Sequence, residues 1–168
     1  LSRRDFIKAA GAAGLGSALV SLNSLTAAHA STSTKVPEQM AVPTRRFGKT
    51  GVDVSILSLG GVLKDTDQLV FRQAFKSGVT YWDTADSYGW GNNEKAIGNY
   101  FAKFPGDREK VFLVTKTASS TAQELSDKLN TSLQRMNTSY IDMYFIHYVS
   151  DAGKELTSEV KAWAESAK

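Results

Sequence analysis

The sequence predicts an α/β fold in which several strands share one parallel sheet. Of its 168 residues, 42% are hydrophobic, 22% are charged and none is cysteine, which excludes collagen-like, wholly disordered and disulfide-stapled chains. Short apolar runs alternate with longer segments whose apolar residues recur at helical spacing, and this alternation is typical of βα units. A run of about 18 strongly apolar residues, which a membrane-spanning helix needs, does not occur.

The beginning of the sequence indicates an export signal. The stretch Ser2-Arg3-Arg4-Asp5-Phe6-Ile7-Lys8 sets two arginines ahead of an apolar pair, and no fixed charge follows from Ala9 to Thr34. Ala28-His29-Ala30 is a small-x-small triplet of the kind that signal peptidases cleave. An amphipathic helix is the alternative interpretation, but the small apolar residues form no stripe along one helix face.

This segment resembles a twin-arginine signal peptide in which Ile7 takes the place of the usual leucine. The resemblance implies that residues 1–30 engage the twin-arginine (Tat) export machinery of a bacterium. It also implies that the mature protein is periplasmic and keeps no stable membrane anchor after cleavage. Residues 31–44 contain two prolines and lack periodicity, so we expect a flexible linker there.

The elements after the linker are expected in a regular order. A small hairpin comes first, over residues 45–55, because glycines bound a turn between its two halves. Thr121 and Glu124 have the spacing of a capping box, which predicts the start of a helix. Strands are expected at residues 56–61, 79–82, 111–114 and 140–146, and the first two helices at residues 65–76 and 94–103. A third helix is expected after Thr121, and its inner face would hold Leu125, Leu129, Leu133 and Met136. The last helix is expected at the end of the sequence, where Val160, Trp163 and Ala167 would lie on one side.

Four βα units fit either an open doubly wound sheet or part of an eight-stranded barrel. The Gly-x-Gly-x-x-Gly signal of the dinucleotide-binding open sheet is missing, because the first strand runs into Gly60-Gly61-Val62-Leu63. A complete barrel needs about 250 residues. Only 124 residues follow Thr44, the last helix has no stop signal and the chain begins without methionine, so we expect a fragment.

Four polar side chains follow or end the expected strands. Asp83 comes after the second strand with Tyr88 in the loop beyond it, Lys116 ends the third strand, and His147 ends the fourth. In a barrel these strand ends form the face where chemistry occurs. Asp83 would supply the counter-charge that Lys116 needs, and the ammonium would favour the phenolate of Tyr88 and so make its hydroxyl a proton donor. His147 would hold a substrate oxygen by a hydrogen bond.

Each of these residues also has an ordinary structural interpretation. An aspartate after a strand is commonly a turn residue, and a tyrosine in a loop commonly packs or lies at the surface. A lysine at a strand end is commonly a solvated charge, and a histidine can be a half-buried residue with its hydrogen bonds satisfied. The functional interpretation therefore rests on the joint arrangement of the four side chains.

Three motifs resemble the aldo-keto reductase family, and together they extend over residues 44–168. They are Arg45-Arg46-Phe47-Gly48-Lys49-Thr50-Gly51 with Leu59-Gly60-Gly61, then Tyr81-Trp82-Asp83-Thr84-Ala85-Asp86-Ser87-Tyr88-Gly89 with Glu94 and Gly98, and finally Ser132-Leu133-Gln134-Arg135-Met136 with Tyr140-Ile141-Asp142-Met143-Tyr144-Phe145-Ile146-His147. The resemblance implies that residues 45–168 are the N-terminal half of a (β/α)₈ TIM barrel, with only the first four βα units present.

The resemblance also implies NADPH-dependent reduction of a small carbonyl substrate to an alcohol, with NADH as the other possible cofactor. Tyr88 would be the general acid, Lys116 and Asp83 the pair that activates it, and His147 the residue that orients the substrate. Asp83 and the backbone near Gly61 would lie beside the nicotinamide ribose. The residues that grip the cofactor in this family would follow Lys168, so we expect the chain alone to be inactive.

Other functions remain open at this stage. The same fold can serve a non-catalytic, nicotinamide-binding regulatory subunit, or the chain can be an inactive gene fragment. A nucleic-acid partner is not expected, because the net charge is only +3 and Arg45-Arg46 is too short for a basic patch. A metal site is not expected either, since a chain without cysteine offers no thiolate ligand.

Overall fold

The computed structural model describes residues 41–61 and 67–168. The expected signal peptide and residues 31–40 of the expected linker lie outside these residues. The described chain begins with a hairpin of β1 (Thr44–Arg46) and β2 (Asp53–Ser55), which pair antiparallel with Arg45 opposite Val54. The hairpin was expected over residues 45–55 and is confirmed.

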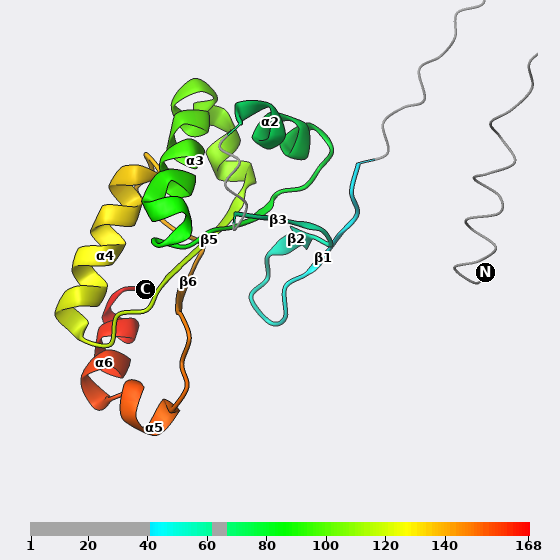
Figure 1. Cartoon of the computed structure of the whole chain (residues 1–168). Coiled ribbons are helices and arrows are strands. Elements are labelled where there is room, and N and C mark those ends of the chain that lie inside the picture. Colours follow the sequence, from blue (N-terminus) through cyan, green and yellow to red (C-terminus); the bar gives the residue numbers. More distant parts are fainter. Residues whose placement is uncertain (1–40, 62–66) are drawn as a thin grey trace, which may run out of the picture. The chain divides into compact units, whose positions relative to one another are not determined.

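One parallel sheet forms the centre of the fold (Figure 1). Its strands are β3 (Ser58–Gly60), β4 (Tyr81–Asp83), β5 (Phe112–Thr117) and β6 (Met143–Ile146), and each pairs in parallel with the next. Their spatial order is therefore the order of the sequence. A doubly wound sheet reverses its strand order near the first strand, whereas a barrel does not, so this order favours the barrel.

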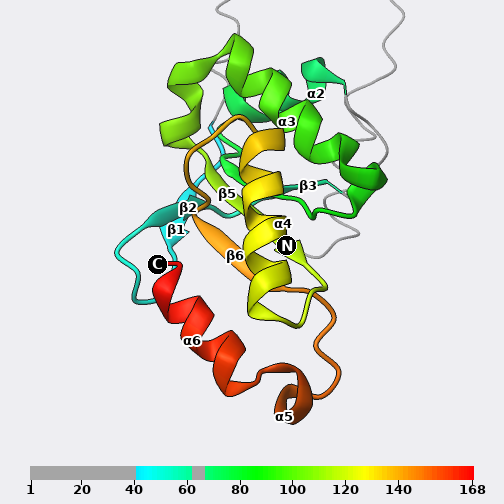
Figure 2. The ribbon, with the colours of Figure 1, turned by 90° about the vertical axis from the view of Figure 1, so that its left-hand side faces the viewer.

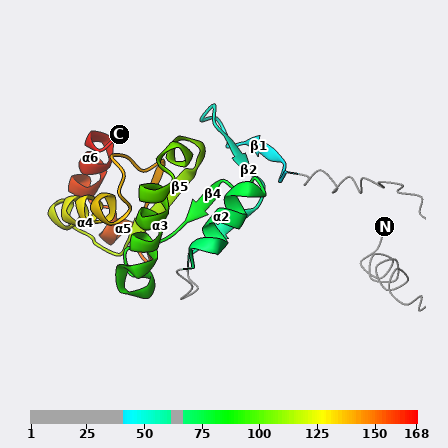
Figure 3. The same cartoon turned by 90° about the horizontal axis from the view of Figure 1, so that it is seen from above.

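Helices cover one face of the sheet. They are α2 (Gln68–Lys76), α3 (Asn92–Lys103), α4 (Ala122–Arg135) and α6 (Ser158–Ser166), and the short α5 (Ala152–Glu155) lies in the segment between β6 and α6. Figure 2 shows α3 and α4 in front of β5 and β6, and Figure 3 shows α2, α3 and α4 following one another along that side. Within the described ranges, no helix is long and apolar enough to cross a membrane.

Two helices begin directly after a side chain that caps their first turn. The Asp67 side chain accepts a hydrogen bond from the Leu69 N–H at the start of α2, and Thr121 accepts one from the Glu124 N–H at the start of α4. Such caps satisfy backbone donors that have no partner within the helix. The helix predicted after Thr121 is therefore confirmed together with its cap.

Some elements differ from the expected ones. Two short 3₁₀ helices, η1 (Tyr88–Gly91) and η2 (Pro105–Lys110), were not expected, because turns of this length carry no periodicity. Strand β5 runs three residues beyond the expected end at Val114. Strand β6 begins only at Met143, because the Asp142 carboxylate accepts hydrogen bonds from the Leu113 N–H and from Arg108.

The alternation of side chains along the strands divides the core into two layers. Leu113 packs between the sheet and the helices with Trp82, and we call this side the helix face. Phe112 and Val114 pack on the opposite side with Val54 of the hairpin, and we call that side the inner face. Because the repeat along a strand is two residues, the inner face continues to the carboxyl ends of the strands.

Candidate active site

The four polar residues predicted from the sequence meet at the carboxyl ends of β4, β5 and β6. Asp83 is the last residue of β4 rather than the residue after it, Lys116 is the last but one of β5, and His147 directly follows β6. Tyr88 is the first residue of η1. The two-residue repeat puts Lys116 on the inner face with Phe112 and Val114.

Asp83 and Lys116 form the ion pair that the sequence predicted. The Lys116 Nζ lies 2.6 Å from the Asp83 Oδ1 and also donates a hydrogen bond to the Thr84 carbonyl oxygen at 2.7 Å. The Lys116 side chain is only 11% exposed, and that of Asp83 is 30% exposed. An ammonium removed from water is costly unless it is paired and hydrogen-bonded, and here both conditions are met.

The Tyr88 ring is the meeting point of the other side chains. The Lys116 ammonium lies over this ring, 5.1 Å from its centroid, which is a cation–π contact. The His147 ring approaches the same ring edge-on, with 6.1 Å between the centroids. The Tyr88 ring is therefore in contact with both a cation and an imidazole, and its hydroxyl is a candidate proton donor.

The surroundings of His147 favour its neutral form. Burial lowers the pKa of His147 below its ordinary value of 6.5, and the positive charge of Lys116 lowers it further, while Asp86 and Asp83 act in the opposite direction. The neutral imidazole therefore predominates at pH 7, and in this form the ring has one N–H to donate. Its backbone is fixed as well, because the His147 N–H donates to the Thr117 carbonyl oxygen at 2.7 Å.

The loop that carries Tyr88 is attached to β5 by hydrogen bonds. The Thr84 N–H donates to the Val114 carbonyl oxygen at 2.8 Å, and the Asp86 N–H donates to the Lys116 carbonyl oxygen at 3.0 Å. The Asp86 carboxylate accepts a further hydrogen bond from the Thr117 hydroxyl at 2.9 Å. Nothing in the sequence alone shows that Asp86 and Thr117 meet. The two-residue repeat along β5 puts Thr117 on the side opposite to Lys116.

Gly61 has a packing role that the sequence did not show. Its N–H donates to the Asp83 carbonyl oxygen at 2.7 Å, and a Cβ on this residue would collide with the amide oxygen of Asn93. Only glycine fits so close an approach. The contact with a cofactor that was expected for Gly61 remains a prediction.

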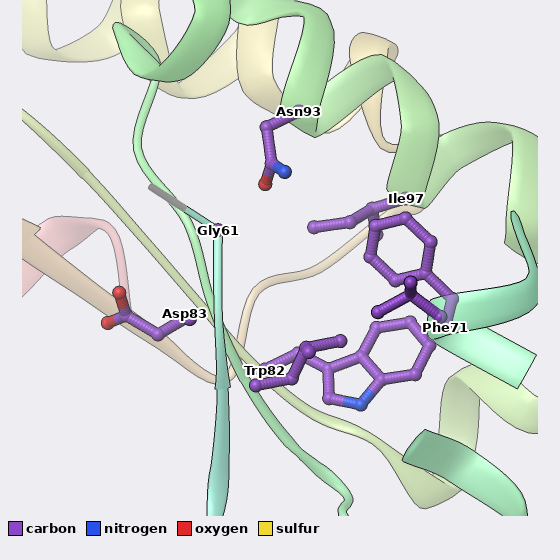
Figure 4. Close-up of a pocket in the computed structure, with 9 residues that line it drawn as sticks. Gly61, Phe71, Trp82, Asp83, Asn93 and Ile97 are labelled. Atoms are coloured by element: carbon purple, nitrogen blue, oxygen red, sulfur yellow. The ribbon is translucent and has the colours of Figure 1, made fainter. Parts of the chain in front are cut away.

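A cavity of about 140 Å³ lies beside Gly61 (Figure 4). Figure 4 shows Phe71, Trp82 and Ile97 lining one side of it, whereas the Asp83 carboxylate is directed away from these apolar residues. Tyr88, Lys116 and His147 are not among its lining residues, which are Leu59, Gly60, Gly61, Val70, Phe71, Trp82, Asp83, Asn93 and Ile97. This cavity therefore belongs to the helix face and is distinct from the cluster around Tyr88.

Residues 41–61 and 67–168 contain no group of three histidine, aspartate or glutamate side chains that could hold a metal ion. The groups gathered around Tyr88 can form hydrogen bonds and ion pairs, and they include side chains that can carry a proton. The Asp83 side chain, on the inner face, is partly exposed. Proton transfer to a substrate oxygen suits this set of groups.

Comparison with protein families gives two matches. The model of the aldo/keto reductase family matches residues 56–161. The model of the twin-arginine translocation (TAT) pathway signal sequence matches residues 1–20. The two matches cover different parts of the chain, and the first contains all four residues of the cluster around Tyr88.

Individual proteins show the same likeness. The aldo-keto reductase yakc of Schizosaccharomyces pombe, whose name specifies NADP(+), is 30% identical over 130 residues, which are 66% of this chain and 38% of that protein. The uncharacterized oxidoreductase YrpG of Bacillus subtilis is 35% identical over 129 residues, which are 61% of this chain and 39% of that protein. The chain thus spans about two fifths of the length of these relatives.

A solved structure extends the likeness to the fold. The crystal structure of an aldo-keto reductase from Klebsiella pneumoniae in complex with NADPH superposes with a TM-score of 0.59 and 27% sequence identity. The superposition covers 76% of this chain and 48% of that chain. The parallel sheet with its helices on one face therefore has the arrangement of the barrel, as the sequence predicted.

Proposed function

The chain belongs to the aldo/keto reductase family, and we propose that the protein containing it reduces a small carbonyl compound to an alcohol with a reduced nicotinamide cofactor. The observation that supports this most is the arrangement around Tyr88. The Lys116 ammonium lies over its ring and the His147 ring lies nearly perpendicular to it, while Asp83 balances the charge of Lys116. Residues 45–168 would be the N-terminal half of the barrel.

Tyr88 would act as the general acid. Reduction of a carbonyl group requires a proton at its oxygen, and the Tyr88 hydroxyl would donate that proton. The Lys116 ammonium, 5.1 Å from the centroid of the Tyr88 ring, would face the negative charge that develops as the proton leaves. Asp83 holds the Lys116 side chain in place through the 2.6 Å ion pair.

His147 would orient the substrate. Its neutral imidazole donates a hydrogen bond from one ring nitrogen to the carbonyl oxygen and so holds this oxygen near the Tyr88 hydroxyl. Because burial and Lys116 lower the pKa of His147, the ring does not compete with Tyr88 as the proton donor at pH 7. The two residues thus have separate tasks, one of orientation and one of proton transfer.

The inner face offers a hydrogen-bond acceptor that fits the ribose of a nicotinamide cofactor. The Asp83 carboxylate is 30% exposed there and can accept a hydrogen bond from a ribose hydroxyl, with the backbone of Gly61 beside it. When bound, the reduced nicotinamide supplies the hydride for the carbonyl carbon. NADP(+) in the name of the fission-yeast relative and NADPH in the Klebsiella structure support NADPH rather than NADH.

The signal sequence adds a location to the proposed activity. The TAT match at residues 1–20 supports export by the twin-arginine machinery and a periplasmic mature protein, without a membrane anchor after cleavage near residue 30. This machinery transports folded proteins, so the enzyme would take up its cofactor before export. The carbonyl substrate would then be a compound that enters the periplasm.

The test is the substitution Tyr88→Phe in the full-length protein, with Tyr140→Phe as the matched control. The ring is retained, so packing persists while the proton donor is lost. Single-turnover reduction of an aldehyde by NADPH should slow by about 10²- to 10⁴-fold. The dissociation constant for NADPH, measured by fluorescence, should remain unchanged in both variants. Reduction at the wild-type rate by Tyr88→Phe would contradict the assignment. NADPH binding without turnover in the wild type would instead favour the regulatory subunit.

A further inference from the structure

Glu94 is a fully buried carboxylate that the proposed reaction does not use. It lies in the first turn of α3, on the helix face, and has no exposed surface. One of its oxygens accepts a hydrogen bond from the Thr115 hydroxyl at 2.8 Å, and the other pairs with the Arg135 Nη1 at 3.1 Å. A buried charge is tolerated only when it is paired and hydrogen-bonded, so this arrangement is built around Glu94.

Arg135 connects Glu94 to the loop that carries Tyr88. Its Nη1 also donates to the Asp86 carbonyl oxygen at 3.1 Å. A Cβ on Gly91, at the end of η1, would lie 2.5 Å from the Arg135 Cζ, so the guanidinium lies directly against the backbone of this turn. Asp86 and Gly91 lie on either side of Tyr88 in the sequence, and Arg135 therefore supports the loop on both sides of the tyrosine.

The other end of the same network reaches Lys116. Thr115, which holds Glu94, is the residue before Lys116 on β5. Because neighbouring residues on a strand point to opposite faces, Thr115 contacts Glu94 under the helices while Lys116 contacts Tyr88 on the inner face. A continuous set of contacts thus leads from Lys116 through Glu94 and Arg135 back to the Tyr88 loop.

We propose that Glu94 and Arg135 are positioning residues that set the distance between the Tyr88 ring and Lys116. This inference rests on the proposed function. The planar guanidinium can pair with a carboxylate, donate a hydrogen bond to the carbonyl oxygen of Asp86 and lie flat against Gly91 at the same time. Loss of these contacts frees the loop to shift, and a displacement of about 1 Å in an active site can cost ~10²-fold in rate.

A second buried arginine provides a matched control. Arg108 pairs with Asp142 at 2.9 Å and donates to the carbonyl oxygens of Val111 and Tyr140. These residues precede β5 and β6, so this ion pair lies at the amino ends of the strands, opposite to the cluster around Tyr88. Both arginines lie at helix–strand junctions and both neutralise a carboxylate, yet only Arg135 touches the Tyr88 loop.

The test compares Arg135→Met with Arg108→Met in the full-length protein. Both variants should lower the melting temperature. Only Arg135→Met should lower kcat, by about 10- to 10²-fold at a temperature where both variants are folded, with the dissociation constant for NADPH unchanged. A third variant, Arg135→Lys, is used in case Arg135→Met does not fold. It keeps a positive charge opposite Glu94, so it should fold. Its kcat should still be below that of the wild type, because an ammonium cannot make all the contacts of the guanidinium.

A spectroscopic signature separates this proposal from the proposed function. The Tyr88 ring shifts the NMR signals of the Lys116 side chain that lies over it, and isotope-labelled lysine makes this shift observable without any activity. The shift should be lost in both Arg135 variants and retained in Arg108→Met and in Tyr88→Phe. Retention of the shift in the Arg135 variants, or an equal loss of kcat in Arg108→Met, would overturn the positioning role. Wild-type turnover by Tyr88→Phe would contradict the proposed function alone.

Discussion

The Lys116 ammonium and the Tyr88 ring come from different βα units, and yet the ammonium lies over the ring, 5.1 Å from its centroid. The same charge lowers the pKa of His147, whose ring lies nearly perpendicular to that of Tyr88. One lysine thus acts on two neighbours. The effect of removing its charge should be measurable at both of them.

Lys116→Met should raise the pKa of His147 toward its ordinary value of 6.5, because one of the two influences that lower it is removed while burial remains. The imidazole signals in an NMR titration of the full-length protein would report this change. Carbonyl reduction should slow at the same time, since the positive charge over the Tyr88 ring is removed. Lys103→Met, at the far end of α3, is the control and should leave both quantities unchanged. An unaltered titration of His147 in Lys116→Met would refute the coupling.

The lowered pKa of His147 also predicts how stability depends on pH. The unfolded chain binds a proton at this histidine near pH 6.5, whereas the folded protein does so only at lower pH. Between these two pKa values the unfolded state holds more protons, so the free energy of unfolding should fall as the pH decreases below about 6.5. Urea unfolding of wild type and His147→Gln between pH 5 and 7.5 would show this as a steeper decline in the wild type. Parallel curves would show that the histidine contributes nothing.

Gly98→Ala should destabilise the protein, although alanine favours helices. A Cβ at Gly98 would collide with the backbone carbonyl oxygen of Arg135, where α3 crosses α4. Overpacking of this kind costs about 1–3 kcal/mol and exceeds the gain of about 1 kcal/mol from helix propensity. Urea unfolding of the full-length protein would measure the difference. Gly106→Ala is the control, because nothing lies within 4 Å of its Cβ, and it should change stability by less than about 0.5 kcal/mol.

Replacement of Arg3 and Arg4 by lysine should stop export. The charge is unchanged, so a signal that is read only by charge would still function, whereas the twin-arginine machinery requires the arginine pair. Fractionation of cells should then find the precursor in the cytoplasm instead of the mature protein in the periplasm. The control replaces Arg45 and Arg46, which lie outside the signal match, and should leave export intact. Periplasmic accumulation of the lysine variant would rule out this route.

Much of the fold was predictable because local signals and packing agree. The Thr121 capping box and the apolar residues of α4 both point to the same helix, and the short apolar run that became β5 is bounded by polar segments. The starts of strands were less predictable. The sequence of residues 140–142 is typical of a strand, but the Asp142 side chain bonds to Arg108 and Leu113 and delays the start of β6. Such side-chain competition depends on contacts between distant residues.

The candidate site was predictable only in part. Asp83, Tyr88, Lys116 and His147 are visible because each follows or ends an apolar run. Arg135 is one polar residue at the end of an amphipathic helix, and nothing local distinguishes it from a solvated charge. Its role depends on a contact with Asp86, which lies 49 residues away in the sequence.

The two-residue repeat of β5 has a consequence for how this protein can vary. Insertion of one residue before Thr115 would turn the Lys116 ammonium toward the helices and turn a threonine toward Tyr88. Glu94 would lose its hydroxyl donor and Asp83 its cation in the same event. A change of one residue within this strand would therefore break both sets of contacts at once, whereas the same change in a loop between the units would leave the register of the strand intact.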